Sequence, residues 1–418
     1  MKDLLIYELK KITKKRLNII VTLGSLVLTF IFFSSNVFQH RSMDKDGNQV
    51  SGFSAIKLDK KFQGELEGLL TEDRIKYDIL QCQSLFENPD NIIVDGENKR
   101  LNDEAYNKYV GPYASYLRLI SNNYTDPEYY DYYFSELDKI STENGVNFYK
   151  ARDEKVSKFL NSNYEGGNYS NKEKSFWLNK NEKIEAPYMY GYHEGWNVLL
   201  NCMELLAVPI IAICICIAPV FAGEYQSGAD SIILSSRYGK SKLVVAKLLA
   251  SFIFAVAIYT IHIALGTGII LSSFGVEGWN LPLQILYTII PYSLNFLTGT
   301  IVCIVTLYLI LFGMVSITLL MSSKMKSAFP VLIVIILIMI VPMFFGTSMT
   351  NGLWNHIFRL LPYWAGQPVF GAGPTIYYSY EILGATTDIL SMRMIVYALL
   401  GICCIPFAYR GFKKHQVS

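Results

Sequence analysis

The sequence is poor in charge and lacks the usual catalytic motifs. Only 17% of its 418 residues are charged, while 51% are hydrophobic. This composition excludes a disordered chain and argues against an ordinary soluble enzyme. The chain contains no Gly-x-x-x-x-Gly-Lys-Ser/Thr phosphate loop, no His-Glu-x-x-His zinc motif and no Gly-x-Ser-x-Gly nucleophile elbow. We therefore expect no enzymatic activity, and no nucleotide, metal or other cofactor bound by this chain.

Cysteine is scarce in the polar part of the chain. Of seven cysteines, only Cys82 lies within residues 39–196, so this part has no disulfide framework. Residues 39–196 are rich in charged residues, Asn and Tyr, whereas residues 197–410 contain few charges. The sequence therefore predicts a membrane protein with one large polar insert.

Six apolar segments approach or exceed the roughly 20 residues that a membrane-spanning helix needs. They are residues 17–38, 198–222, 243–273, 292–321, 328–345 and 392–409. Residues 283–291, bounded by Pro282 and Pro291, are predicted as an interfacial or re-entrant piece before the fourth span. The predicted fold is an all-α polytopic membrane protein with six transmembrane helices and a mainly helical extracellular domain, residues 39–196, between helices 1 and 2.

Lysine and arginine gather in four short segments. These are residues 1–16, 223–242, 322–327 and 410–418. With six spans, all four lie on one side of the membrane, which the positive-inside rule makes cytoplasmic. Both termini are then cytoplasmic, and the protein is expected in the plasma membrane.

The segments on the other side are the insert and loops 274–291 and 346–391. The insert holds 27 acidic and 20 basic residues, and its net negative charge suits translocation. Loop 346–391 contains "GLWNHIFRLLPYW", which predicts interfacial helices, with a gate as the alternative.

The insert has helical patterns that begin at recognisable caps. Thr71 precedes one of them and is predicted as its N-cap, and another begins at Asn102. Sixteen tyrosines lie in the insert. They either pack inside a polar helical domain or form a surface for peptide or carbohydrate, because tyrosine suits both roles.

Ionisable groups inside spans are functional candidates, and three stand out: Glu204, His262 and Arg393. Glu204 and Arg393 are placed to form a pair near the outer surface, either structural or part of a substrate site. His262 is expected to be a neutral, hydrogen-bonded side chain rather than a ligand. So few intramembrane charges argue against an ion-coupled carrier.

The stretch "FAGEYQSGADSIILSSRYGKSKLVVAK", residues 221–247, carries the strongest functional signal. A positive-inside loop explains its lysines, but not a glutamate at the membrane edge followed by glycine and a short apolar piece. The candidate residues are Glu224, Gly228, Ile232, Ile233, Leu234, Arg237, Lys240 and Lys247. The pattern resembles the permease subunits of type-2 ABC exporters, in the branch with a large extracellular insert between the first and second spans.

The N-terminal "YELKKITKKRLN" extends this resemblance, because it is similar to the family's amphipathic elbow helix. Its basic residues are Lys10, Lys11, Lys14, Lys15 and Arg16. The resemblance implies that loop 223–242 docks into a separate ABC ATPase subunit, which binds ATP and Mg. Glu224 would cap the coupling helix or pair with an elbow lysine such as Lys14 or Lys15.

Further partners implied by the resemblance are a second permease copy, identical or different, and membrane lipid, but no nucleic acid. The expected function is the permease subunit of an ATP-driven exporter of peptide, drug, lipid or ion. The alternative is a non-transporting sensor or assembly protein whose extracellular domain binds a ligand or partner.

Overall fold

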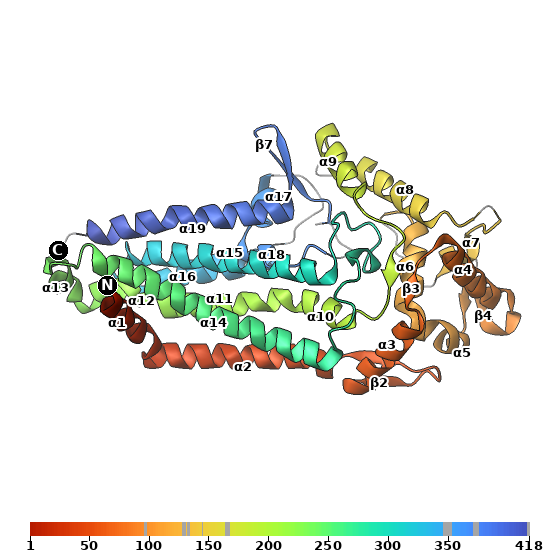
Figure 1. Cartoon of the computed structure of the whole chain (residues 1–418), viewed down its shortest axis with the longest axis horizontal. Coiled ribbons are helices and arrows are strands. Elements are labelled where there is room, and N and C mark those ends of the chain that lie inside the picture. Colours follow the sequence, from red (N-terminus) through yellow and green to blue (C-terminus); the bar gives the residue numbers. More distant parts are fainter. Residues whose placement is uncertain are drawn as a thin grey trace.

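The computed structural model of the chain describes residues 1–95, 98–127, 131, 134–143, 145–163, 168–345, 353–370 and 376–415. The molecule is elongated. A bundle of long helices forms one end, and a domain built mainly from residues 39–193, the insert domain, forms the other (Figure 1). Parts of loop 346–391, of the insert and of the C-terminal tail lie outside the described residues.

Five helical stretches among the described residues are long and apolar enough to cross a membrane. They are α2 (Arg16–Phe38), the stretch Glu194–Ser227, α14 (Lys242–Phe274), α15 (Phe296–Ser322) and α19 (Ile389–Lys413). They confirm an all-α polytopic membrane protein, and they correspond to the first, second, third, fourth and sixth predicted spans.

The fifth predicted span, residues 328–345, forms a shorter apolar helix. α16 (Ala328–Ile340) continues into the 3-10 turn η6 (Val341–Phe344). Pro342 lies at the start of η6, and proline cannot donate the backbone hydrogen bond that continues an α-helix. The segment is therefore too short to be counted as a membrane-spanning helix by its length alone. A sixth crossing stays a prediction.

The second span runs through the middle of the bundle in several pieces. It consists of α10 (Glu194–Cys202), the 3-10 turn η4 (Met203–Leu206), α11 (Ala207–Ile217) and α12 (Pro219–Ser227). α11 packs against α2, α14, α15 and α16. By contrast, α2 buries a narrow face and leaves apolar side chains such as Leu23 and Phe30 exposed, as expected of a helix that faces lipid.

The insert domain is mainly helical. Its longer helices are α3 (Phe53–Glu65), α4 (Glu72–Glu87), α6 (Ala114–Tyr124), α8 (Phe148–Asn161) and α9 (Asn171–Asn181). The predicted N-cap Thr71 is confirmed, because its side chain accepts from the Arg74 amide. A helix also begins at Asn102 as predicted, and the Asn102 side chain accepts from the Ala105 amide. These caps depend on local sequence alone.

Short antiparallel strand pairs, which the sequence did not predict, complete the insert domain. The pairs are β1 (Arg41–Met43) with β2 (Gln49–Ser51), β3 (Gly68–Leu69) with β6 (Met189–Tyr190), and β4 (Ile92–Asp95) with β5 (Asn98–Leu101). Strands of two to four residues are too short to show an alternating pattern.

Several tyrosines of the insert lie in its core. Tyr116, Tyr188, Tyr190 and Tyr192 are buried. The rings of Tyr116 and Tyr190 meet edge to face with centroids 4.9 Å apart, which is a favourable aromatic geometry. For these residues the packing interpretation holds.

Residues 283–291 lie buried between the insert domain and the bundle. They contain a single 3-10 turn, η5 (Leu283–Ile285), and then irregular backbone. Arg152 of α8 donates to the Thr288 carbonyl at 3.2 Å, and the Thr288 hydroxyl donates to the Asn123 side chain at 2.7 Å. These contacts attach the insert domain to the bundle.

Loop 346–391 contributes further contacts at the same junction. Its described parts form the short helices α17 (Leu353–Phe358) and α18 (Pro362–Ala365) and the hairpin of β7 (Ser379–Ile382) with β8 (Ala385–Asp388). Lys180 of α9 pairs with Asp388 at 2.8 Å. Trp354 is 72% exposed, as an interfacial helix requires, and that assignment stays a prediction.

Candidate functional site

The segment after the second span forms a helix-turn-helix at the end of the molecule that carries both chain termini (Figure 1). α12 ends at Ser227, and Gly228 has a φ of +70°, a left-handed conformation that glycine adopts without steric cost. The chain then turns into α13 (Ala229–Ser235). The predicted helical turn over residues 231–235 is confirmed and is two residues longer.

The side chains of α13 face two ways. Leu234 is buried, whereas Ile232 is 75% exposed at the surface, near the exposed Arg237 and Lys240. Gly239 brings the following turn back onto α13, since a Cβ there would lie 1.7 Å from the Ile233 carbonyl oxygen. The result is a projection that exposes the side chains of Ile232 and Tyr238 beside basic residues. We call residues 228–241 the coupling segment.

Glu224 is the centre of a buried ionic cluster just before the coupling segment. It is 4% exposed and accepts from Lys247 of α14 at 2.6 Å and from Lys11 of α1 (Lys2–Thr13). Lys247, 1% exposed, also donates to Glu8 of α1 at 2.9 Å. We call Glu8, Lys11, Glu224 and Lys247 the inner cluster.

Glu224 pairs with a basic residue of the elbow, as predicted, but the partner is Lys11 and not one of the two examples that the sequence analysis named. Pairing with Lys14 or Lys15 is wrong, because α1 ends at Thr13 and both residues are exposed beyond its end. Lys11 lies one turn after Glu8, so the two share a helix face. That spacing was the signal for Glu8, which the sequence analysis missed. Lys10 and Arg16 are also exposed.

Lys11 stays charged at neutral pH. Its partial burial acts to lower the pKa of Lys11, but the hydrogen bond and the charge of Glu224 outweigh this effect, so the pKa is raised. The inner cluster thus holds two carboxylates and at least one firmly protonated amine between three helices. Breaking such a buried group by removing one partner is costly, because a charge is left without compensation.

The helix of the second span is interrupted at Pro219, shortly before Glu224 of the inner cluster. Pro219 starts α12, and the Ser322 hydroxyl at the end of α15 donates to the Ala218 carbonyl at 2.6 Å. The same hydroxyl oxygen accepts from the Phe221 and Ala222 amides, at 3.1 and 3.0 Å. A single side chain therefore satisfies the backbone where proline interrupts the helix, and it joins α12 to α15.

The coupling segment, the inner cluster and the bundle thus form one connected unit at one end of the molecule. A family model described as ABC-2 family transporter protein matches residues 4–360. The chain belongs to this family. No curated protein and no solved structure matches it.

Membership of this family shows what kind of protein this is. It is a membrane permease component of an ABC transporter. Members of this family are typically non-catalytic transmembrane components, and the family implies partnership with an ABC ATPase subunit. The matched range includes Glu8, Lys11, Glu224 and Lys247, so the whole inner cluster lies within the family region.

In the permease, the three intramembrane candidates Glu204, His262 and Arg393 do not pair with one another. His262 lies within hydrogen-bond distance of the Thr29 and Ser25 hydroxyls, at 2.8 and 3.2 Å, so its predicted hydrogen bonding inside the bundle is confirmed. The prediction that Glu204 pairs with Arg393 is wrong. Arg393 is buried and donates to the Gln367 carbonyl at 2.8 Å, while Glu204 is exposed on η4.

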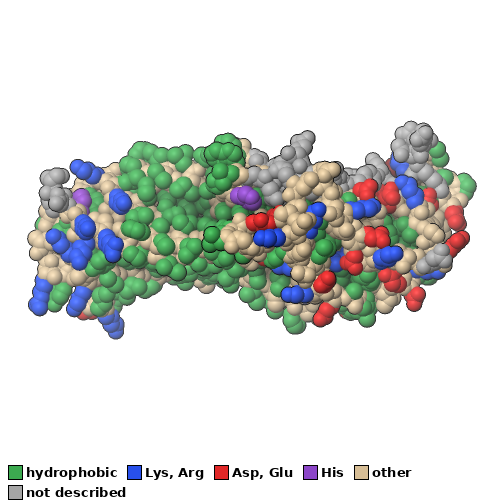
Figure 2. All heavy atoms as spheres, turned by 90° about the horizontal axis from the view of Figure 1, so that it is seen from above, with side chains coloured by type: hydrophobic (Ala, Val, Ile, Leu, Met, Phe, Trp, Pro, Cys, Tyr) green, Lys and Arg blue, Asp and Glu red, His purple; other side chains and the backbone are tan. Residues whose placement is uncertain are grey.

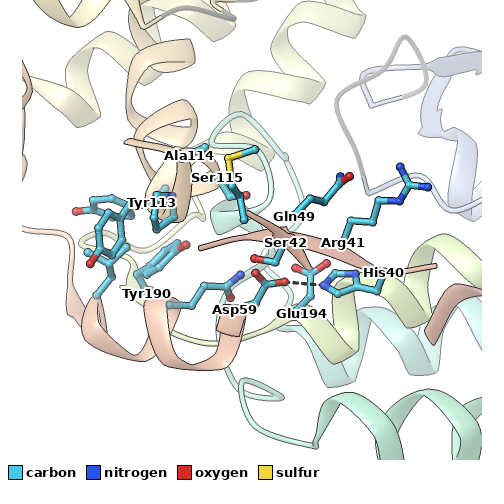
Figure 3. Close-up of a pocket in the computed structure, with 16 residues that line it drawn as sticks. His40, Arg41, Ser42, Gln49, Asp59, Tyr113, Ala114, Ser115, Tyr190 and Glu194 are labelled. Carbon is cyan, nitrogen blue, oxygen red and sulfur yellow. Dashed lines mark hydrogen bonds and ion pairs between the residues drawn. The ribbon is translucent and has the colours of Figure 1, made fainter. Parts of the chain in front are cut away.

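A polar cavity of the permease lies in the insert domain, next to the start of α10. It has a volume of about 360 Å³, and its lining includes His40, Asp59, Gln63, Tyr190 and Glu194. Figure 3 shows the His40 ring directed at Asp59, with Glu194 close by. The His40 Nε2 and Asp59 Oδ2 atoms are 2.6 Å apart.

This pair makes the stability of the permease depend on pH. Burial acts to lower the pKa of His40, but the hydrogen bond and charge of Asp59 outweigh it, so the pKa is raised above 6.5. The pair therefore stabilises the fold fully below pH 6.5, and this contribution is lost as the pH rises through the raised value. We expect His40→Gln to reduce the fall in melting temperature between pH 5.5 and pH 8.5. Asp59→Asn should have the same effect, and an unchanged pH dependence in both variants would contradict the assignment.

Proposed function

We propose that this permease exports its substrate with energy from ATP hydrolysis in a separate subunit that docks onto the coupling segment. The observation that carries the proposal is the inner cluster, which ties α12 to α1 and α14 immediately before the segment. Exposed Ile232, Arg237 and Lys240 supply an apolar contact and positive charge for the docking partner.

The contacts suggest how motion would reach the membrane. α13 is joined to α12 through Gly228, and α12 is held to α1 and α14 by the inner cluster. The break at Pro219, bridged by Ser322, lets the inner part of the second span tilt against the rest while α15 follows. Displacement of the coupling segment would thus move several helices together, as a rigid body on a hinge.

A polar face of the second span supports a path between two permease copies. Glu194, Asn197, Asn201 and Glu204 recur at helical spacing, and the Asn201 amide donates to the Asn197 side chain at 3.2 Å. Asn201 and Glu204 are exposed. Such groups are costly against lipid and usually face a partner helix or a water-filled cavity. We propose that this face meets a second copy, identical or different, across the path of the substrate.

The proposed topology has six crossings. α16 and η6 together would form the fifth, and both termini and the coupling segment would be cytoplasmic. Both termini lie at the end of the molecule opposite the insert domain, which supports an even number of crossings (Figure 1). The insert domain would then be extracellular.

The test is co-purification of the tagged permease with its ATPase. Wild type should retain, in stoichiometric amount, a protein that mass spectrometry identifies as an ABC ATPase. A sensor or assembly protein would retain none, and that result would reject the proposal.

Gly239→Ala should weaken this association by about tenfold or more, because the new Cβ displaces the turn of the coupling segment. The matched control is Gly268→Ala in α14, where an added Cβ meets nothing within 4 Å. If the ATPase is retained equally by both variants, it does not dock on this segment.

A further inference from the structure

A long apolar groove follows the outside of the bundle between α14 and α19. Two adjoining hollows of about 560 and 730 Å³ form it, and Phe252 and Ile405 line both. The larger hollow also reaches Leu309 and Phe312 of α15, and apart from the Tyr397 hydroxyl its side chains are hydrocarbon. The groove thus combines the length of two neighbouring cavities with an apolar lining.

One end of the groove is basic. Arg410, Lys413 and Lys414 line the smaller hollow near the C-terminal end of α19. Figure 2 shows the same division on this side of the molecule, with hydrophobic side chains over the bundle and Lys and Arg at the end away from the insert domain. Next to these cations, the Tyr409 hydroxyl donates to the Lys240 carbonyl of the coupling segment at 3.4 Å.

Small residues keep the groove open. Ala257, Ala398 and Gly401 line the larger hollow. A Cβ on Gly401 would only touch Phe312, at 3.8 Å, so a larger side chain there extends into the hollow rather than into the packed bundle. Groove volume can therefore be changed without disturbing the helix contacts.

The charge pattern selects one kind of occupant. An acyl chain fits an apolar trough along two membrane helices, and a phosphate group fits three cations at the end of those helices. A helix of a second copy would cover the trough but leave the cations without a counter-charge. We infer that this groove binds an anionic phospholipid from the leaflet next to the coupling segment. The inference goes beyond the proposed function and does not depend on export.

The experiment is photo-crosslinking of the full-length permease in nanodiscs. The discs contain phosphatidylglycerol or phosphatidylcholine with a photoactivatable acyl chain, and adducts are mapped by mass spectrometry. Wild type should be labelled on α14 and α19 around Phe252 and Ile405. Phosphatidylglycerol should label it about tenfold more than phosphatidylcholine, given the attraction of three basic residues.

Two variants and one control separate head-group from chain recognition. The triple variant Arg410→Gln, Lys413→Gln, Lys414→Gln should lose the preference for phosphatidylglycerol. Gly401→Leu keeps the charges and should lower labelling by both lipids. The control Lys324→Gln, Lys326→Gln removes two exposed cations that do not line the groove and should change nothing.

Three results would overturn the inference. They are equal labelling by the two lipids in wild type, the same lipid preference in the triple variant, and adducts that map away from α14 and α19. A fourth such result is the absence of labelling around Phe252 and Ile405 by either lipid, which is expected if a second copy covers the groove. Gly401→Leu keeps the test decisive if the triple variant fails to fold.

Discussion

Lys247→Met is expected to destabilise the permease by about 3–5 kcal/mol, the range for removing one partner of a buried ion pair. The substitution leaves Glu8 and Glu224 buried together, with only the half-exposed Lys11 as a counter-charge. The measurement is thermal unfolding of the purified protein, and we expect the melting temperature to fall by about 5 °C or more.

A second substitution in the same chain makes this prediction sharper. Glu8→Gln added to Lys247→Met removes one uncompensated carboxylate and leaves Glu224 paired with Lys11. The double variant should therefore be more stable than Lys247→Met alone, a non-additive result typical of residues in one network. Lys14→Met, which removes an exposed lysine at the end of α1, is the control and should be close to wild type. If the two changes simply add, the four residues do not act as a cluster.

Glu224→Lys is expected to lower export at least about tenfold while hydrolysis by the ATPase continues. The new amine faces Lys11 and Lys247, with only Glu8 as a counter-charge, so α12 and α1 are pushed apart. Membrane insertion should be intact, because the apolar segments determine it. Export and ATP hydrolysis are measured together in vesicles that contain the permease and its ATPase.

The controls for Glu224→Lys separate charge reversal from loss of the cluster. Asp3→Lys reverses an exposed charge on α1 and should export normally. Glu224→Gln should lower export less than Glu224→Lys does, because Lys247 keeps its ion pair with Glu8 and the new amide oxygen still accepts a hydrogen bond. Normal export by Glu224→Lys would remove Glu224 from the coupling mechanism.

Features that depend on a short stretch of chain were accessible from the sequence. Five spans were placed within a few residues, because a bilayer demands a long apolar run wherever the chain crosses it. Thr71 was identified as a cap, and Asn102 as the start of a helix, because a cap bonds an amide three residues away. The short helix after Gly228 was predicted for the same reason, since a left-handed glycine and the following apolar turn are neighbours in sequence.

Pairings between distant segments were not accessible. The sequence singled out Glu224 and suggested a basic elbow residue such as Lys14 or Lys15 as its partner, but it did not specify Lys11, because the partner depends on which face α1 turns toward α12. Glu204 and Arg393 were suggested as a pair on depth alone, yet Arg393 instead bonds the Gln367 carbonyl. The pairing of residues 68–69 with 189–190 gave no signal, since two-residue strands have no periodicity.

By itself, then, the sequence determined that the chain is a membrane protein and where its long spans lie, and both follow from local hydropathy and local charge. Its resemblance to type-2 ABC exporters marked the segment that we propose meets an ATPase. The tertiary structure alone decided that Glu8, Lys11, Glu224 and Lys247 form one buried cluster, and that α14 and α19 enclose an apolar groove with a basic end. Both require three or more segments to pack at one place, and no single stretch of chain specifies that geometry.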